Sequence, residues 1–201
     1  MTTIVAISAG LSDPSTTRML ADRLADSVKR QYGDASVEVV SLRELAHDIT
    51  DASLTGFASP RLQMVIDQVV AADGLIIVTP IFKASYPGLF KSFIDALEAD
   101  ALIGKPVLLA ATGGTARHSL AIDHALRPLF AYLQTLIVPT GVFASSYDWG
   151  TDGVNALGQR IDRAAGELVS LLKGAGTGRK PSDEIDLFSD TFLSISRPTE
   201  G

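Results

Sequence analysis

The sequence predicts an open, doubly wound α/β fold, with five parallel strands between two layers of helices. Short runs rich in Val, Ile and Leu alternate with longer segments of helical period, five of each along 201 residues. Three of the runs are almost continuously hydrophobic, which is typical of parallel strands covered by helices on both faces. A chain of this length, 46% hydrophobic, can bury one sizeable core.

Each expected element follows from a run or a period in the sequence. The five expected strands are TIVAIS (3–8), VEVVSL (37–42), GLIIVTP (74–80), PVLLAAT (106–112) and TLIVPTGVF (135–143). The five expected helices cover residues 16–31, 60–72, 87–98, 118–133 and 153–173. Pro87 suits the first turn of its helix, whereas Pro128 predicts a kink in the fourth helix.

Composition excludes several classes of function. The net charge of −6 provides no basic surface for nucleic acid, and the absence of cysteine excludes disulfides, iron–sulfur clusters and thiol nucleophiles. His47, His118 and His124 have no metal-ligand spacing. The amino-terminal MTTIVAISAG lacks the basic region of a signal peptide, and no apolar stretch approaches membrane-spanning length. We therefore expect a soluble cytoplasmic protein with no nucleic-acid or membrane partner.

A change of composition after Lys173 divides the chain into a domain, residues 1–173, and a tail, residues 174–201. The tail begins with the glycine-rich and then acidic GAGTGRKPSDEIDLFSD, followed by TFLSISRP. One interpretation is a flexible terminus. The other is an arm that docks IDLF or TFLSI onto a neighbouring subunit.

Ligands of doubly wound sheets bind at the carboxyl ends of the strands, so the loops that follow residues 8, 79 and 112 are candidates. The first loop, SAGLSDPSTTR (8–18), gathers hydroxyl groups and one cation: Ser8, Ser12, Ser15, Thr16, Thr17 and Arg18. With the amides of a helix N-terminus, they suit a terminal phosphate. Neither the dinucleotide fingerprint nor the P-loop motif is present. The alternative is an ordinary helix N-cap.

The second loop, TPIFKASYPG (79–88), follows a buried strand that Pro80 ends. Phe82, Lys83, Ser85 and Tyr86 come in quick succession, and they combine an apolar face with polar edges. A flat heteroaromatic ligand needs both features. The alternative is that Phe82 and Tyr86 pack only against another subunit.

The third loop, ATGGTARH (111–118), places Gly113 and Gly114 at a strand end, where backbone amides can approach a ligand closely. Thr112 and Thr115 add hydroxyl groups. The alternative is an ordinary strand-to-helix turn. His118 is either a ligand contact or a solvated or capping residue.

Together the three stretches, SAGLSDPSTTR, TPIFKASYPGLFKSFIDAL and ATGGTARHSLAIDHALRPLFAYL, resemble the flavodoxin-like NAD(P)H-dependent FMN reductases. The resemblance covers residues 3 to 173, and the second stretch is its most specific part. It points to the branch that supplies reduced flavin to two-component monooxygenases. The fold it implies is a flavodoxin-like, five-stranded, three-layer α/β/α domain.

The resemblance implies that NAD(P)H reduces FMN by hydride transfer to flavin N5, and that reduced FMN passes to a partner monooxygenase. It assigns the FMN phosphate to Ser8, Ser15, Thr16, Thr17 and Arg18. It assigns the ribityl chain and the isoalloxazine to Pro80, Ile81, Phe82, Lys83 and Ser85, with Thr112, Gly113, Gly114 and Thr115 on the other side of the ring. The flavin supplies the redox chemistry, so no catalytic side chain is expected, although Lys83 could tune the flavin electrostatically.

Two other functions stay open at this stage. One is an FMN-bound NAD(P)H-dependent reductase of quinones, azo compounds or metal oxyanions, and the other is a flavodoxin-type electron carrier. The resemblance also implies a homodimer or homotetramer with the active site at a subunit boundary. Arg18, Lys83 and Arg117 are the candidates for recognising the 2′-phosphate that distinguishes NADPH from NADH.

Overall fold

The computed structural model describes residues 1–150 and 154–174. The expected tail, apart from Gly174, therefore lies outside the described residues, and so do its IDLF and TFLSI segments.

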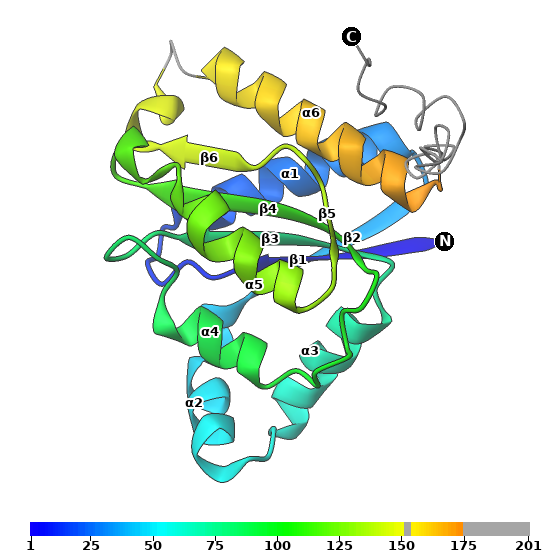
Figure 1. Ribbon diagram of the computed structural model, residues 1–201, viewed down its shortest axis with the longest axis vertical. Coiled ribbons are helices and arrows are strands. Elements are labelled where there is room, and N and C mark those ends of the chain that lie inside the picture. Colours follow the sequence, from blue (N-terminus) through cyan, green and yellow to red (C-terminus); the bar gives the residue numbers. More distant parts are fainter. Residues whose placement is uncertain (151–153, 175–201) are drawn as a thin grey trace, which may run out of the picture.

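A parallel sheet forms the centre of the fold, with the strand order β2-β1-β3-β4-β5, and β6 also pairs with β4 (Figure 1). This is the order of the flavodoxin-like doubly wound fold, in which the winding reverses between β1 and β3. The expected fold class is therefore confirmed. The strands are β1 (Thr2–Ser8), β2 (Ala35–Ser41), β3 (Gly74–Pro80), β4 (Pro106–Gly113), β5 (Leu136–Ile137) and β6 (Val142–Ser145).

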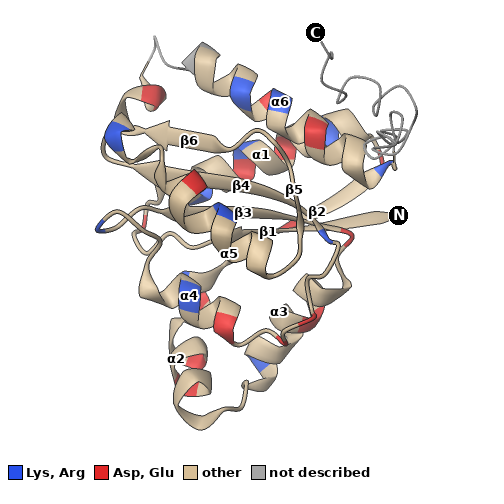
Figure 2. Cartoon of the chain, in the orientation of Figure 1, with Lys and Arg blue, Asp and Glu red and all other residues tan. Residues whose placement is uncertain are grey.

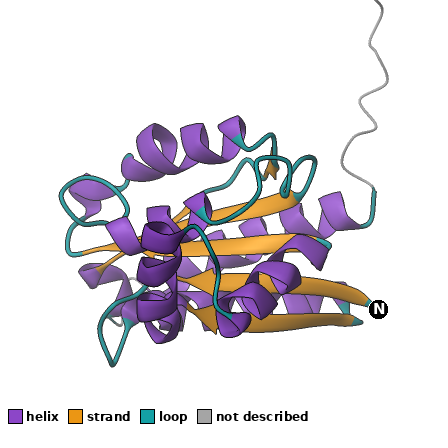
Figure 3. Cartoon of the chain, turned by 90° about the horizontal axis from the view of Figure 1, so that it is seen from below, coloured by secondary structure: helices purple, strands orange, loops and turns teal. Residues whose placement is uncertain are grey.

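Helices cover both faces of this sheet, as the two views at right angles show (Figures 1 and 3). Side chains of α1 and α6 pack in one buried cluster with the strands, and those of α2, α3, α4 and α5 pack in the other. The helices are α1 (Thr16–Tyr32), α2 (Ala46–Thr55), α3 (Pro60–Ala71), α4 (Gly88–Asp95), α5 (Arg127–Tyr132) and α6 (Val154–Leu172).

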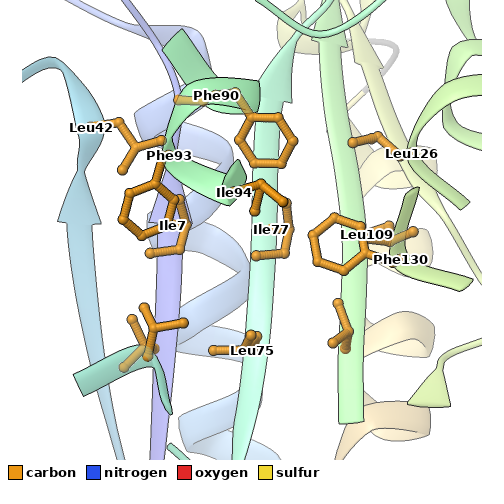
Figure 4. Close-up of a cluster of buried hydrophobic side chains, with 14 of the residues drawn as sticks. Ile7, Leu42, Leu75, Ile77, Phe90, Phe93, Ile94, Leu109, Leu126 and Phe130 are labelled. Atoms are coloured by element: carbon orange, nitrogen blue, oxygen red, sulfur yellow. The ribbon is translucent and has the colours of Figure 1, made fainter. Parts of the chain in front are cut away.

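Alternation along the strands divides the core into these two clusters. Ile76 and Val78 of β3 belong to the cluster under α1 and α6, whereas Leu75 and Ile77 face the opposite helices. All seven residues of β3 are buried, which explains its continuous hydrophobic sequence. Figure 4 shows Phe90, Phe93 and Ile94 of α4 lying over β1 and β3, with Leu126 and Phe130 beside β4.

The expected strand 135–143 is interrupted into two short strands that both pair with β4. Pro139 has no N–H for a ladder hydrogen bond, so pairing stops there. The guanidinium of Arg127 donates to the carbonyls of Val138 and Pro139, and Glu167 accepts hydrogen bonds from the Thr140 amide and hydroxyl, both at 2.7 Å. Side chains from α5 and α6 thus satisfy the polar groups that the sheet leaves free.

The kinked helix expected over residues 118–133 is confirmed only in part, because the helical stretch is shorter and its irregular turn precedes Pro128. The segment contains a short 3-10 turn (Ala116–His118), a π-helical turn (Ile122–Leu126) and α5. Pro128 lies in the first turn of α5, where its missing N–H breaks no helical hydrogen bond.

The helix α2 was not expected from the sequence. Its residues AHDITDASLT include several weak helix formers, and only Ile49 and Ala52 are buried. A 3-10 turn, Leu42–Leu45, leads into it, and the buried side chains of both elements belong to the same cluster as those of α3 and α4.

Charged side chains lie mostly on the helices and connections: β2 contains Glu38, whereas β1, β3, β4 and β6 contain none (Figure 2). No helix in the described ranges 1–150 and 154–174 is both long and apolar enough to span a membrane.

Candidate active site

A cavity of about 680 Å³ lies at the carboxyl edge of the sheet. Eight of the predicted site residues line it: Thr16, Thr17, Pro80, Ile81, Phe82, Thr112, Gly113 and Gly114. Leu11, Ser12, Met19, Ser146 and Trp149 complete the lining. Parallel strands and the start of α1 thus bring the three predicted loops to one place. Six predicted residues do not line the cavity: Ser8, Ser15, Arg18, Lys83, Ser85 and Thr115.

Buried hydroxyl groups gather at this edge. Six polar side chains are buried in the part of the chain that the structure describes, and five of them lie here: Ser8, Thr17, Thr79, Thr112 and Ser145. Ser8 is the last residue of β1, Thr79 is the next-to-last residue of β3, and Ser145 is the last residue of β6. Burying a hydroxyl group is unfavourable unless it has a hydrogen-bond partner. The concentration of buried hydroxyls at this edge therefore makes it the polar part of the core.

The first loop ends in an N-cap that leaves backbone donors free. The Ser15 side chain accepts a hydrogen bond from the Arg18 amide at 3.3 Å. The Thr16 and Thr17 amides donate to no acceptor within residues 1–150 and 154–174. Because these N–H groups lie at the positive end of the α1 dipole, they are suited to bind an anion.

Gly10 allows the loop to fold back against this cap. A Cβ at residue 10 would lie 2.1 Å from Ser15 Oγ and 3.0 Å from Thr17 Cβ. No side chain fits in that space, so glycine is required for a close approach and not for a turn. The serine of the cap is thereby fixed between the loop and the helix.

Arg18 points along α1 and not into the cavity. Its Nε donates to Asp22 at 2.9 Å, one turn further along the helix. The other predicted cation, Lys83 in the second loop, is exposed at the tip of a hairpin.

The second loop forms a two-residue hairpin that projects beyond the sheet (Figure 1). The Phe82 amide donates to the Ser85 carbonyl at 2.8 Å, and the Ser85 amide returns a hydrogen bond at 3.1 Å. Lys83 and Ala84 both have positive φ, at 50° and 68°. Two such residues define the tight hairpin turn that normally selects Asn or Gly, so this loop is strained.

The hairpin has one anchored end and one exposed ring. The Ile81 amide donates to the Thr112 carbonyl at 2.8 Å, which fixes the start of the loop to β4. Tyr86 packs edge-on against Phe90, with ring centroids 5.4 Å apart, at the other end. Phe82, which lines the cavity, is 49% exposed. An apolar ring is therefore held at the mouth of the cavity.

The third loop brings backbone close to the cavity. A Cβ at Gly113 would lie 2.9 Å from the Phe143 ring, so a glycine is needed where β4 passes over that ring. Thr115 caps the following 3-10 turn through the Arg117 amide at 3.4 Å. The buried Nδ1 of His118 has no hydrogen-bond partner in the described part of the chain, but His118 does not line the cavity.

Sequence reasoning missed the side of the cavity formed by Ser146 and Trp149. Both belong to the 3-10 turn Ser146–Trp149 that follows β6. The signal was present, because a serine pair follows the last strand run, but the interruption at Pro139 hid where that strand ends.

No charged side chain lines the cavity among the residues that the structure places. Two lysines have shifted pKa values, and both lie elsewhere. The hydrogen bond to Asp95 raises the pKa of Lys91 on α4, and desolvation lowers the pKa of Lys105 just before β4. The lining of the cavity thus combines free backbone amides, hydroxyl groups and apolar side chains.

These features fit FMN. The free amides at the start of α1 suit its phosphate, and Ile81, Phe82 and the Gly113–Gly114 backbone suit a flat ring with polar edges.

Comparisons with known proteins agree with this fit. Residues 2–150 match the family described as NADPH-dependent FMN reductase. The chain is 38% identical over 173 residues to an FMN reductase (NADPH) of Pseudomonas aeruginosa, covering 85% of this chain and 92% of that protein. It is also 38% identical over 170 residues to the NADH-dependent FMN reductase SfnE of Pseudomonas putida, covering 84% and 91%.

Solved structures give the same result. An oxidoreductase from Corynebacterium diphtheriae superposes with a TM-score of 0.83 at 46% identity, covering 87% of this chain and 98% of that one. The apo form of an NADH:FMN oxidoreductase, EmoB, superposes with a TM-score of 0.71 at 35% identity, covering 82% and 89%. The sequence resemblance is confirmed: this chain belongs to the NADPH-dependent FMN reductase family.

Proposed function

We propose that this reductase oxidises NAD(P)H, reduces FMN and delivers the reduced FMN to a partner flavin-dependent monooxygenase. The observation that supports the reductase activity is a cavity without charged lining residues at the point where three strand ends meet the N-terminus of α1. Delivery to a monooxygenase rests on the resemblance of the TPIFKASYPG stretch to the branch that supplies such enzymes.

The residues of the cavity bind and orient the flavin. The Thr16 and Thr17 amides hold its phosphate, with the Ser15 cap behind them. Phe82 and the backbone of Gly113 and Gly114 position the ring. FMN held by these residues would supply the hydride acceptor, its N5 atom. The protein contributes mainly by holding the flavin and nicotinamide rings in contact. This needs no acidic or basic side chain and no metal ion.

Lys83 is proposed to tune the flavin electrostatically. It lies at the tip of the 82–85 hairpin, next to Phe82 in sequence, and no ion pair to it is found among the described residues. A cation near the pyrimidine end of the ring stabilises the reduced anion. The same hairpin places Ser85 in backbone contact with Phe82.

Ser8, Arg18 and Thr115 are proposed as supporting residues of the same site. Ser8 is buried at the end of β1, and Thr115 caps the turn after Gly114. Arg18 raises the positive potential at the start of α1, although its guanidinium pairs with Asp22.

We also propose a homodimer or homotetramer with the active site at a subunit boundary. The Phe82 ring at the mouth of the cavity supports it, because this apolar side chain is 49% exposed and is available for contact with a second subunit. Docking of the tail onto a neighbouring subunit, and residence in the cytoplasm, stay predictions from the sequence.

The test is a titration of the apoprotein with FMN, followed by turnover with NADH or NADPH. We expect weak, reversible FMN binding and many turnovers of free FMN. Tight binding, with reduction that stops after one equivalent unless a quinone is added, would instead identify a bound-flavin reductase. Binding without oxidation of NAD(P)H would identify an electron carrier, and no binding would refute the site.

A further inference from the structure

The cavity has a second apolar side, apart from the Ile81, Phe82 and Gly113–Gly114 surface assigned to the FMN ring. Trp149 lines it together with Leu11 and Met19, which are 38% and 45% exposed. Trp149 packs against the core cluster under α1 and α6, whereas Ile81 belongs to the cluster on the other face of the sheet. The apolar surfaces of this one cavity thus come from opposite faces of the sheet.

The turn that carries Trp149 is firmly held. The Asp148 carboxylate accepts hydrogen bonds from the Ser145 amide at 2.7 Å and from the Ser145 hydroxyl at 2.6 Å. Ser145 is buried and pairs with Gly113 of β4. The position of Trp149 is therefore fixed relative to the glycine loop.

A cation backs the indole. The Arg23 guanidinium carbon lies 4.9 Å from the centroid of a Trp149 ring. Arg23 is one turn beyond Met19 on α1, so both side chains lie along the same side of that helix. Core packing alone would bury the indole, but Trp149 is only half-buried and lines the cavity.

A ligand with two flat ring systems joined through phosphate would contact both sides at once. The free amides of Thr16 and Thr17, which hold the flavin phosphate in the proposed function, lie in the same cavity, so the phosphate of an adenylate would lie next to the flavin phosphate. FMN has one ring system, at the far end of the ribityl chain from its phosphate. We propose that Trp149, backed by Arg23, is a stacking platform for an adenine ring, and that the cavity holds an adenine dinucleotide by its adenylate end.

Two substrates of a flavin reductase contain adenylate, namely FAD and NAD(P)H. Adenine stacks on an aromatic side chain through its flat face, so the adenine of FAD and that of NAD(P)H could stack on Trp149 equally well. The inference deepens the proposed function, because it concerns the same cavity, but its first test needs no electron transfer.

That first test uses the fluorescence of Trp149, which is the only tryptophan of the chain. Titration of the full chain with 5′-AMP should give saturable quenching, with an affinity about tenfold higher than that for inorganic phosphate. Equal affinities for the two anions, or AMP binding without a change in tryptophan emission, would overturn the platform. A protein that binds AMP in this way but does not oxidise NAD(P)H would refute only the proposed function.

Variants then identify which substrate uses the platform. In Trp149→Ala, the KM for FAD should rise about tenfold relative to that for FMN if FAD is the source. The KM for NADPH or NADH should rise by a similar factor if the nicotinamide cofactor is the source. Trp149→Phe keeps an aromatic face, so it should restore most of the loss. Unchanged KM values for all adenylates, or an equal change for FMN and FAD with none for NAD(P)H, would contradict the proposal.

Tyr147→Ala is the matched control. Tyr147 lies in the same turn, is 81% exposed and does not line the cavity. Its removal should leave AMP binding and all KM values within twofold of the wild type, so that damage to the turn is separated from loss of the platform.

Discussion

The hydroxyl oxygens of Thr17 and Thr112 lie 2.8 Å apart, although 95 residues separate them in the chain. Thr17 is in the first turn of α1 and Thr112 is near the end of β4. Both side chains are buried, at 2% and 4% exposure, and both line the cavity. This hydrogen bond therefore couples the anion site at the helix to the glycine loop.

Breaking this pair should cost stability. Thr112→Val keeps the shape of the side chain but leaves the Thr17 hydroxyl buried without its partner. We expect a loss of about 1–3 kcal/mol in the free energy of unfolding, measured with urea, and weaker FMN binding because α1 is no longer fixed to β4.

The double variant Thr17→Val/Thr112→Val controls for this interpretation. With both hydroxyls removed, no buried donor lacks a partner, so the double variant should lose less stability than the two single variants added together. Additive losses would mean that the hydrogen bond contributes no coupling.

Gly10→Ala should damage the phosphate end of the site. The new Cβ would meet Ser15 Oγ at 2.1 Å, so the serine must move and the Arg18 amide loses its acceptor. Loss of an N-cap costs about 0.5–2 kcal/mol, and we expect FMN affinity to fall with it. Gly88→Ala is the matched control, because no atom lies within 4 Å of its Cβ at the start of α4. Equal effects of the two substitutions would contradict the role of Gly10.

The 82–85 hairpin should tolerate glycine better than alanine. Ala84 has a φ of 68°, in the left-handed region that costs a non-glycine residue about 1–2 kcal/mol. After subtraction of the entropy cost of glycine, Ala84→Gly should raise the free energy of unfolding by about 0.5–1 kcal/mol.

The control for that substitution is Ala131→Gly, at an exposed position of the right-handed helix α5. It should lower the free energy of unfolding by up to about 1 kcal/mol. A loss of stability in both variants would show that the hairpin is not strained at Ala84.

Lys105 predicts a pH dependence of stability. Its ammonium donates to the carbonyls of Val70 and Ala72, and desolvation lowers its pKa below the ordinary 10.5. Between the lowered pKa and 10.5, the unfolded chain binds more protons than the folded chain, so this residue makes stability rise with pH. Lys105→Met should remove that rise, as measured by urea unfolding from pH 8 to pH 10.5. The same pH slope in both proteins would contradict the assignment.

Strong local patterns made much of the fold predictable. The runs at 3–8, 74–80 and 106–112 agree with β1, β3 and β4 to within one residue at each end. A strand buried on both faces must be hydrophobic at nearly every position, which is an unambiguous signal. The helix α2 lacked such a signal, because only Ile49 and Ala52 of its ten residues are buried.

The site was predictable where it depends on strand ends. Thr16, Phe82 and Gly113 line one cavity because three parallel strands end at one edge and α1 begins there. The strained φ of Lys83 and Ala84 was not predictable, since neither residue type favours that conformation. The hairpin is imposed by its ends, which Thr112 and Phe90 fix in space.

The sequence by itself determined the doubly wound fold, the edge of the sheet where the cavity lies and the three loops that contribute most of its lining, because each follows from short-range patterns of burial and hydrogen bonding. Only the tertiary structure decided that Thr17 bonds to Thr112, that Gly10 lies against Ser15 and that Trp149 joins the cavity. These contacts connect residues whose spacing in the chain contains no record of their proximity. Trp149 reaches the cavity because the packing of α1 and α6 against one face of the sheet brings α1 and the turn after β6 together.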